Sequence, residues 1–362
     1  MRELNQVLED FNIAIKNGQM VGDELQIRYF YYQLLSFMDI RFSINDPEVI
    51  GLIKLLQPEF ARTLSKAAQK RLACWNYVTR HRLTIANHQN DRLTQHIERR
   101  FKSDQLYLFL NQVVQPYFQR LTPSVSKYEG AMLYSFMVSF YILGEENFSS
   151  YDLTRRKKIG TAMLDTFTRE MILNDYGYQR LSIEDERGLT YHLAQIHAQA
   201  LYFRGNLTIF DQERLTYYYQ AQLTTAPSDL LARLMTQTFT REPELAANTS
   251  AKAFIWQNYA NLIIATEFSL HHTVFVGIEL SNLTSLSDSL YHFLVAQLSG
   301  IAQVTIEKYR QHQYYDLVLT TVEKPIAVEK NRYYLSEFIS DYDIKKIKIR
   351  LSAIKREKQG NK

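Results

Sequence analysis

Residues 273–321 read TVFVGIELSNLTSLSDSLYHFLVAQLSGIAQVTIEKYRQHQYYDLVLTT, and in them short β-rich runs alternate with a helical run. Residues 273–278 are β-branched and aromatic, and residues 302–306 and 316–321 are two similar runs. Between them, residues 286–298 repeat large apolar side chains at helical spacing and stop at a Ser-Gly pair. Strand–helix–strand spacing of this kind is typical of parallel strands joined by a helical crossover. The stretch therefore predicts a small α/β unit with a mostly parallel sheet.

The chain before this unit carries helical periodicity, and after it residues 332–335 predict a fourth strand. Leu4, Leu8, Phe11 and Ile15 recur at helical spacing, which predicts an N-terminal linker helix over residues 1–17.

Two proline-containing breaks, at Thr122-Pro123 and at Glu242-Pro243, divide the helical part. We therefore predict a mainly α chain of three domains. They are a first helical module over residues 1–122, a second over 123–250 with about five helices each, and an α/β domain with a basic C-terminal helix over 251–362.

The composition is that of a packed globular protein, with 46% hydrophobic and 22% charged residues. One cysteine, Cys74, excludes an internal disulfide and a cysteine-based zinc cluster, and it fits a reducing cytoplasm. No signal peptide and no apolar run of membrane-spanning length is present. We expect a cytoplasmic protein without a membrane partner.

The net charge of +4 hides a segregation of charge. Residues 54–102 hold 11 Lys/Arg against 3 Asp/Glu, and residues 345–362 hold 8 against 1, whereas the rest of the chain is acidic. Each basic segment is either a solvated helix face or frayed tail, or a surface for an anionic partner, nucleic acid or phosphoprotein.

The segment GDELQIRYFYYQLL, residues 22–35, resembles the segment that follows the DNA-binding region in Mga/AtxA-type transcriptional regulators of Gram-positive bacteria. The order of domains is also similar to that family, which has two helical regulatory modules named PRD and then a phosphotransferase enzyme IIB-like domain. Family members carry winged-helix and helix-turn-helix domains ahead of the first PRD. We find no match to them here, so we expect a chain that starts after that region and reaches DNA only through domains it lacks.

The resemblance also implies a phosphorylatable Cys in the loop after the first strand of an active IIB domain. Here that loop contains Glu279, Leu280, Ser281 and Asn282 and has no Cys, so we expect a degenerate phosphate loop. The family implies that such a domain dimerises the protein instead.

In PRD modules the resemblance implies regulation by histidine phosphorylation from the carrier HPr. We select His81 and His88 in the first module and His192 and His197 in the second, with Arg80 and Arg82 as docking groups for phosphate or partner. For each histidine the alternative is an ordinary surface or packing role. His192 and His197 are five residues apart, so their side chains point roughly 140° from each other on a helix.

We thus predict the regulatory and dimerising part of a transcriptional regulator, a homodimer with HPr as a transient partner. We expect no enzymatic activity, no catalytic residue, no cofactor and no metal. The alternatives are a helical interaction scaffold without phosphate chemistry and a degenerate IIB-type phosphocarrier. Direct DNA binding by residues 54–102 is a further alternative.

Overall fold

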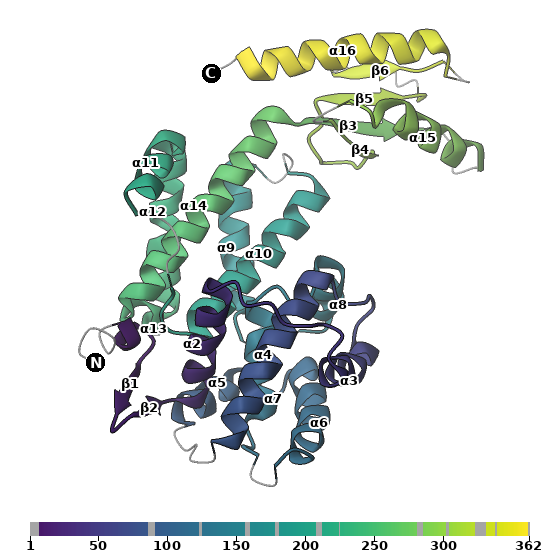
Figure 1. The fold of residues 1–362 in the computed structure, drawn as a ribbon. Helices are drawn as coiled ribbons and strands as arrows, with labels where there is room; N and C mark the ends of the chain where they lie inside the picture. Colours follow the sequence, from purple (N-terminus) through teal and green to yellow (C-terminus); the bar gives the residue numbers. More distant parts are fainter. Residues whose placement is uncertain are drawn as a thin grey trace. The chain divides into compact units, whose positions relative to one another are not determined.

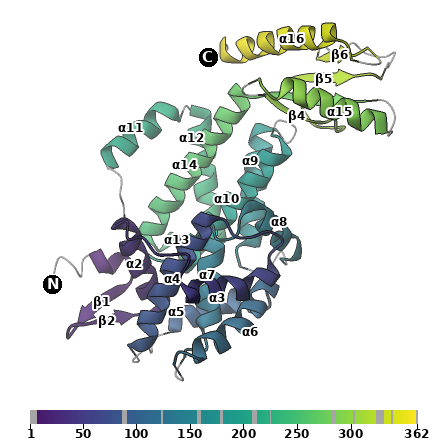
Figure 2. The same ribbon diagram turned by 45° about the vertical axis from the view of Figure 1, so that its right-hand side comes forward.

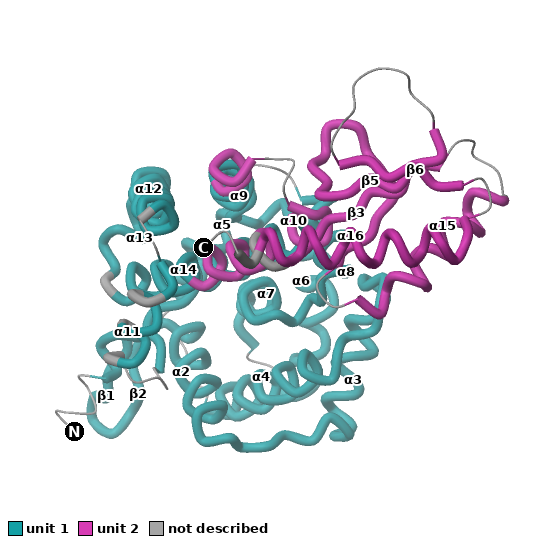
Figure 3. The backbone as a smooth tube through the Cα atoms, turned by 90° about the horizontal axis from the view of Figure 1, so that it is seen from above, with its two compact units in different colours: residues 1–171, 187–260 teal, residues 172–186, 261–362 magenta. Residues whose placement is uncertain are grey.

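The computed structural model describes residues 7–85, 91–122, 125–155, 160–177, 181–207, 212–223, 225–280, 285–301, 304–322, 331–336 and 339–360. The chain forms two compact units (Figure 3). Unit 1 comprises residues 1–171 and 187–260, and unit 2 comprises residues 172–186 and 261–362. Among the described residues, no helix combines the length and apolar character that crossing a membrane requires.

Helices dominate the chain up to residue 272 (Figure 1). Their bounds are α2 Glu24–Phe37, α3 Pro47–Leu56, η1 Gln57–Glu59, α4 Lys66–Thr84, α5 Arg92–Phe101, α6 Gln105–Gln119, α7 Glu129–Ser139, α8 Glu145–Thr154, α9 Ala162–Tyr176, α10 Ile183–Tyr202, α11 Gln212–Gln222, α12 Thr225–Arg241, α13 Pro243–Ala246 and α14 Thr249–His272. The expected mainly helical character is confirmed. The division into modules at residues 122 and 250 stays a prediction, and α6 and α7, on either side of residue 122, lie against each other.

The predicted N-terminal helix over residues 1–17 is wrong beyond residue 10. Residues 7–10 are helical, and the chain then forms a β-hairpin of β1 (Ile13–Lys16) and β2 (Gln19–Gly22) that leads into α2 (Figure 2). Asn17 and Gly18 both have positive φ, 50° and 75°. A two-residue turn of this kind matches the twist of the flanking strands, which is why Asn-Gly favours a hairpin over a helix end.

Asp23 caps α2, as its position before Glu24 indicates, and it also fixes the start of α5. Its Oδ1 accepts the Leu25 amide at 3.1 Å, and its Oδ2 accepts the Leu93 amide at 2.8 Å. The Thr94 hydroxyl donates to Oδ1 at 2.8 Å. One carboxylate thus satisfies amide groups at the N-termini of two helices.

The centre of unit 1 holds a fully buried arginine. The Arg28 side chain on α2 is 1% exposed, and its guanidinium donates to both carboxylate oxygens of Glu129 on α7, at 2.6 and 2.8 Å. Nε of Arg28 donates to Glu24 at 2.9 Å, and Arg82 on α4 also binds Glu24, at 2.8 and 3.1 Å. Beside this cluster, the rings of Trp75 and Phe136 stack at 4.3 Å. Ionic and aromatic contacts therefore join α2, α4 and α7.

Unit 2 contains the α/β fold that residues 273–321 predict. Its elements are β3 Val274–Glu279, α15 Ser285–Leu298, β4 Val304–Lys308, β5 Leu317–Thr320, β6 Arg332–Tyr334 and α16 Asp341–Gly360. The strands lie in the order β4-β3-β5-β6, and all three pairings are parallel. The expected parallel sheet and its fourth strand are confirmed.

One face of this sheet is covered by both helices. Val276 and Leu319 of the strands pack with Leu294 of α15 and with Ile347 and Leu351 of α16 in one buried cluster. Strand residues alternate between faces, and Phe275 and Val318 lie in a separate, smaller cluster with Tyr315. The apolar side of α16 is therefore used inside unit 2.

We predict that Glu129→Ala lowers the free energy of unfolding by about 3–5 kcal/mol, because it leaves Arg28 buried with only Glu24, which Arg82 shares. Urea denaturation followed by circular dichroism measures this loss. The matched control is Glu146→Ala, which breaks the exposed pair with Arg62, 69% and 73% exposed, and should cost less than about 1 kcal/mol. Equal losses in the two variants would contradict the central role of Arg28.

Candidate functional site: the histidines of unit 1

His81 lies on the surface at the end of α4. Its side chain is exposed, and its ring packs at 4.3 Å from the ring of Tyr77, one turn earlier on the same helix. Tyr77 in turn contacts Phe42 at 5.0 Å. His88 lies outside the described residues. In the first predicted module, His81 is therefore the candidate whose imidazole a partner protein can reach without a change in the fold.

The two arginines beside His81 are already paired with carboxylates. Arg80 binds Glu48 of α3 at 2.7 Å, with both side chains about one-third exposed. Arg82 binds Glu24 and is 11% exposed, so it belongs to the buried Arg28 cluster. A phosphate at His81 would have to compete with these carboxylates for the guanidinium groups, which leaves docking by Arg80 and Arg82 a prediction.

His192 is half-buried on α10. Its Nδ1 lies 3.3 Å from the hydroxyl of Tyr141, and its ring contacts the rings of Tyr141 and Tyr191. Burial lowers the pKa of His192, and nearby Glu145 offsets only part of this effect. The imidazole is thus kept neutral at pH 7, with one nitrogen facing a hydroxyl group.

His197 is completely buried, with both ring nitrogens occupied. Nδ1 lies 2.6 Å from Oδ1 of Asp165 on α9, and Nε2 lies 2.6 Å from the hydroxyl of Tyr259 on α14. The exposed fraction of the His197 side chain is 0%. The Tyr259 hydroxyl also lies 2.8 Å from that of Thr238 on α12. The geometry of His197 is that of a packing histidine.

The network continues from Asp165 to a buried arginine. The other carboxylate oxygen of Asp165 binds Arg155 at 2.8 Å and accepts the Thr161 hydroxyl at 2.9 Å. Arg155 binds Asp152 at 2.7 Å. Burial alone would raise the pKa of Asp165, but the positive Arg155 and the hydrogen bond from His197 outweigh it and hold that pKa below its ordinary value. Asp165 is therefore ionised in the fold.

The sequence did not identify Asp165 and Tyr259, which contact His197, or Arg155, which binds Asp165. They come from α9, α14 and the end of α8, at positions 32, 62 and 42 residues from His197. No spacing rule connects such positions, and each of the three looks like an ordinary helix residue. The sequence signal that remains is the five-residue spacing of His192 and His197, which places the two side chains on different sides of α10. The side of α10 that is buried could have drawn attention to His197.

The loop expected to be a degenerate phosphate site begins with Glu279, whose side-chain carboxylate is engaged by neighbouring residues. Glu279 ends β3, where its carboxylate pairs with the guanidinium of Arg332 and accepts the Thr320 hydroxyl at 3.1 Å. Leu280 packs against the core of unit 2. Ser281 and Asn282 lie outside the described residues. The Arg332 guanidinium at this edge of the sheet is therefore already paired with a carboxylate.

Among the described residues, the structure brings no three His, Cys, Asp or Glu side chains together in a way that could hold a metal ion. Cys74 is buried in α4, and burial raises the pKa of its thiol to about 12. The thiol is therefore not a nucleophile at neutral pH.

We predict that Asp165→Asn lowers stability at pH 7, because Arg155 then keeps only Asp152, and also weakens the acid sensitivity of the fold. A carboxyl group whose folded pKa is depressed stabilises the fold above its unfolded pKa, which is 3.8 for Asp165. That contribution is lost as the pH falls through the lower folded value. Melting temperatures measured between pH 2.5 and 7 should fall less steeply on acidification in Asp165→Asn than in the unmodified protein.

The matched control for this prediction is Asp104→Asn. Asp104 is also buried and hydrogen-bonded, to Tyr151 at 3.0 Å, but burial raises its pKa. The contribution of Asp104 to stability therefore decreases as the pH rises, which is opposite to that of Asp165. Asp104→Asn should therefore keep the full acid sensitivity of the fold. An Asp165→Asn protein as acid-sensitive as the unmodified chain would contradict the prediction.

Comparison with known families identifies a similarity at the N-terminal end of the described chain. A family model described as "Mga helix-turn-helix domain" matches residues 1–35, which include the hairpin and most of α2. No curated protein matches the chain. The match corrects the expectation that nothing here corresponds to the helix-turn-helix region of Mga-type regulators. It does not extend to the predicted PRD modules or to phosphotransferase control, and it shows that residues 1–35 are similar to the helix-turn-helix domain of Mga-type regulators.

Proposed function

We propose that this chain is a transcriptional regulator of the Mga type whose unit 1 receives a phosphorylation signal on histidine and whose unit 2 joins two copies. The observation that carries the proposal is the match of residues 1–35 to the Mga helix-turn-helix domain. In this proposal the protein is a homodimer in the cytoplasm, without enzymatic activity or cofactor, and HPr is a transient partner.

In this proposal residues 1–35 contribute a DNA-binding element, but they carry few positive charges. A two-stranded β-ribbon such as the β1–β2 hairpin has the width that the major groove of DNA admits. Residues 1–35 contain three Lys/Arg against five Asp/Glu, and one of the three, Arg28, is buried. Lys16 is exposed at the end of β1. A complete DNA interface therefore requires positive charge from other parts of the protein or of its partner copy.

Exposure favours His81 as the phosphoacceptor. A phosphate adds a charge of about −1.5 to −2 and three acceptor oxygens. Placed next to Arg82, it would compete with Glu24 for that guanidinium, and Glu24 also binds Arg28. In this mechanism phosphorylation weakens the ionic cluster that joins α2, α4 and α7, and α2 directly follows the hairpin.

The second candidate is a helical interaction scaffold without phosphate chemistry, and the burial of His197 favours it. Both nitrogens of that histidine are engaged, so a phosphate could reach it only if the helices separated. The third, a IIB-type phosphocarrier, is opposed by the paired carboxylate of Glu279 and by the absence of Cys from residues 279–285.

We predict that incubation with enzyme I, HPr and phosphoenolpyruvate labels His81 and leaves His197 unlabelled. Mass spectrometry of peptides kept at alkaline pH, where phosphohistidine survives, locates the label. His81→Ala should lose most of the label, and His96→Ala, which removes another half-exposed histidine, should retain it. A chain that takes up no phosphate on any histidine would leave the scaffold as the function.

We predict that the full chain enriches particular sequences from a pool of random duplexes, and that Lys16→Gln weakens binding to them. Loss of one phosphate contact should reduce the dependence of log affinity on log salt by about 1. Lys66→Gln, an exposed lysine of α4 outside the matched residues, serves as the control. Enrichment of no sequence would count against a helix-turn-helix role for residues 1–35.

A further inference from the structure

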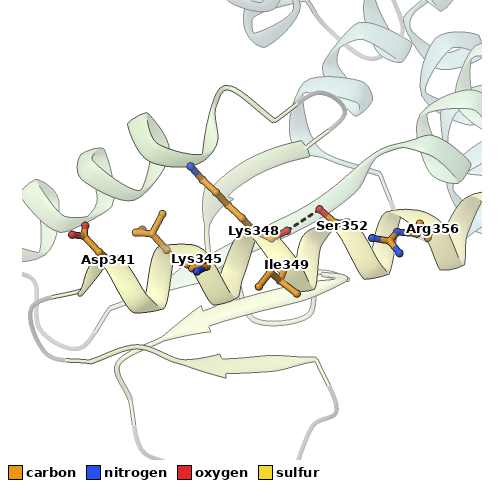
Figure 4. Close-up of a pocket in the computed structure, with 7 residues that line it drawn as sticks. Asp341, Lys345, Lys348, Ile349, Ser352 and Arg356 are labelled. Carbon is orange, nitrogen blue, oxygen red and sulfur yellow. Dashed lines mark hydrogen bonds between the residues drawn. The ribbon is translucent and has the colours of Figure 1, made fainter.

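The outer face of α16 carries a row of positive side chains along a shallow hollow (Figure 4). Lys345, Lys348 and Arg356 line the hollow together with Ile349 and Ser352. With 100° between successive residues, these five positions fall within about 100° of the helix circumference, and Lys345 and Arg356 are about 16 Å apart along the axis. The row is thus straight and faces one direction.

These three cations are not neutralised inside the protein. Within the described part of the chain, the side chains of Lys345, Lys348 and Arg356 form no ion pair or hydrogen bond. Lys358 on the same helix differs, because it binds Asp316 at 2.6 Å and two backbone carbonyls. The sequence from residue 345 to 362 holds 8 Lys/Arg against 1 Asp/Glu, so this part of α16 carries a large net positive charge.

We propose that this face of α16 binds the phosphates of duplex DNA, independently of base sequence. A row of cations on one side of a helix, spread over about 16 Å, is complementary to a polyanion such as duplex DNA, and displaced counterions favour the contact. The inference itself rests on the geometry and charge of α16 and not on the helix-turn-helix match.

A membrane surface fits this face less well. Helices that bind at the membrane interface insert an apolar face between the lipid headgroups. The apolar face of α16, with Ile344, Ile347 and Leu351, is buried against the sheet. On the outer side Tyr342 and Ile349 are the exposed large apolar residues of this helix. The outer face therefore offers charge with little to insert.

One carboxylate lies in the same row, and its removal should change DNA affinity in the direction opposite to removal of the cations. Asp341 lines the hollow one turn before Lys345. Its charge would repel a DNA phosphate, so Asp341→Asn should strengthen binding while three Lys/Arg→Gln changes weaken it. Gln keeps helix propensity close to that of Lys and Arg, and the three side chains are exposed, so folding should be unaffected.

The experiment measures fluorescence anisotropy of a labelled 25-base-pair duplex of random sequence with the full chain, between 50 and 300 mM NaCl. In the variant Lys345→Gln/Lys348→Gln/Arg356→Gln, the slope of log affinity against log salt should fall by about 2–3, and affinity at 100 mM salt should fall at least about tenfold. Circular dichroism and the melting temperature verify that the variant is folded.

The matched control is Lys54→Gln/Lys66→Gln/Lys70→Gln, the same change of charge at exposed positions of α3 and α4. Its slope should stay close to that of the unmodified chain. An unchanged slope in the α16 variant, or equal losses in both variants, would overturn the proposal. Binding of phosphatidylserine vesicles through the α16 cations, without DNA binding, would also overturn it. Because the duplex has no selected sequence, the result does not depend on whether residues 1–35 recognise a site.

Discussion

The Arg28 side chain places a permanent positive charge in the interior of unit 1, and the surrounding residues of the fold neutralise that charge. Burial alone would lower the pKa of Arg28, but Glu129 and Glu24 together raise it above its ordinary value, so the guanidinium stays charged. A buried charge that lacks a partner costs several kcal/mol, and α2 and α7 must therefore keep one relative position. Arg82 adds α4 to the same cluster through Glu24. This constraint lies at the start of the chain, directly after the β1–β2 hairpin.

The same requirement shapes the second polar centre of unit 1. His197, Asp165 and Arg155 satisfy one another in the interior, and Tyr259 and Thr238 complete the hydrogen bonds. Such a network is favourable only while each member keeps its partners, which makes it suited to fixing helices and unsuited to exchanging phosphate. His81 differs from His197 in that its imidazole reaches the surface.

Charge is placed differently in unit 2. Glu279 and Arg332 neutralise each other at the carboxyl edge of the sheet. The cations of α16 lie on the outer side of a helix whose inner side packs on the sheet. In unit 2 the charges at the edge of the sheet are therefore paired, whereas the cations on the outer face of α16 are exposed. The proposed DNA contact uses this face of α16.

The sequence by itself determined the elements that follow from local pattern. Residues 273–321 specified the parallel α/β unit, because alternating β-branched runs and a leucine-rich helix have few ways to pack. The start of α2 is also a local feature, because Asp23 is a preferred N-cap residue and caps the helix. The Asn17-Gly18 turn was equally local, but the apolar spacing of Leu4, Leu8, Phe11 and Ile15 fits a helix, and hairpin pairing outweighed that periodicity.

Only the tertiary structure decided which polar residues meet. Glu129 lies 101 residues from Arg28, and Tyr259 lies 62 residues from His197, so neither pairing leaves a trace in sequence spacing. The five-residue separation of His192 and His197 indicated that the two would differ, but it could not indicate which one would be buried. That choice depends on which face of α10 the neighbouring helices cover. Side-chain burial and ion pairing are properties of assembled helices, whereas helix and strand formation are largely properties of the local chain.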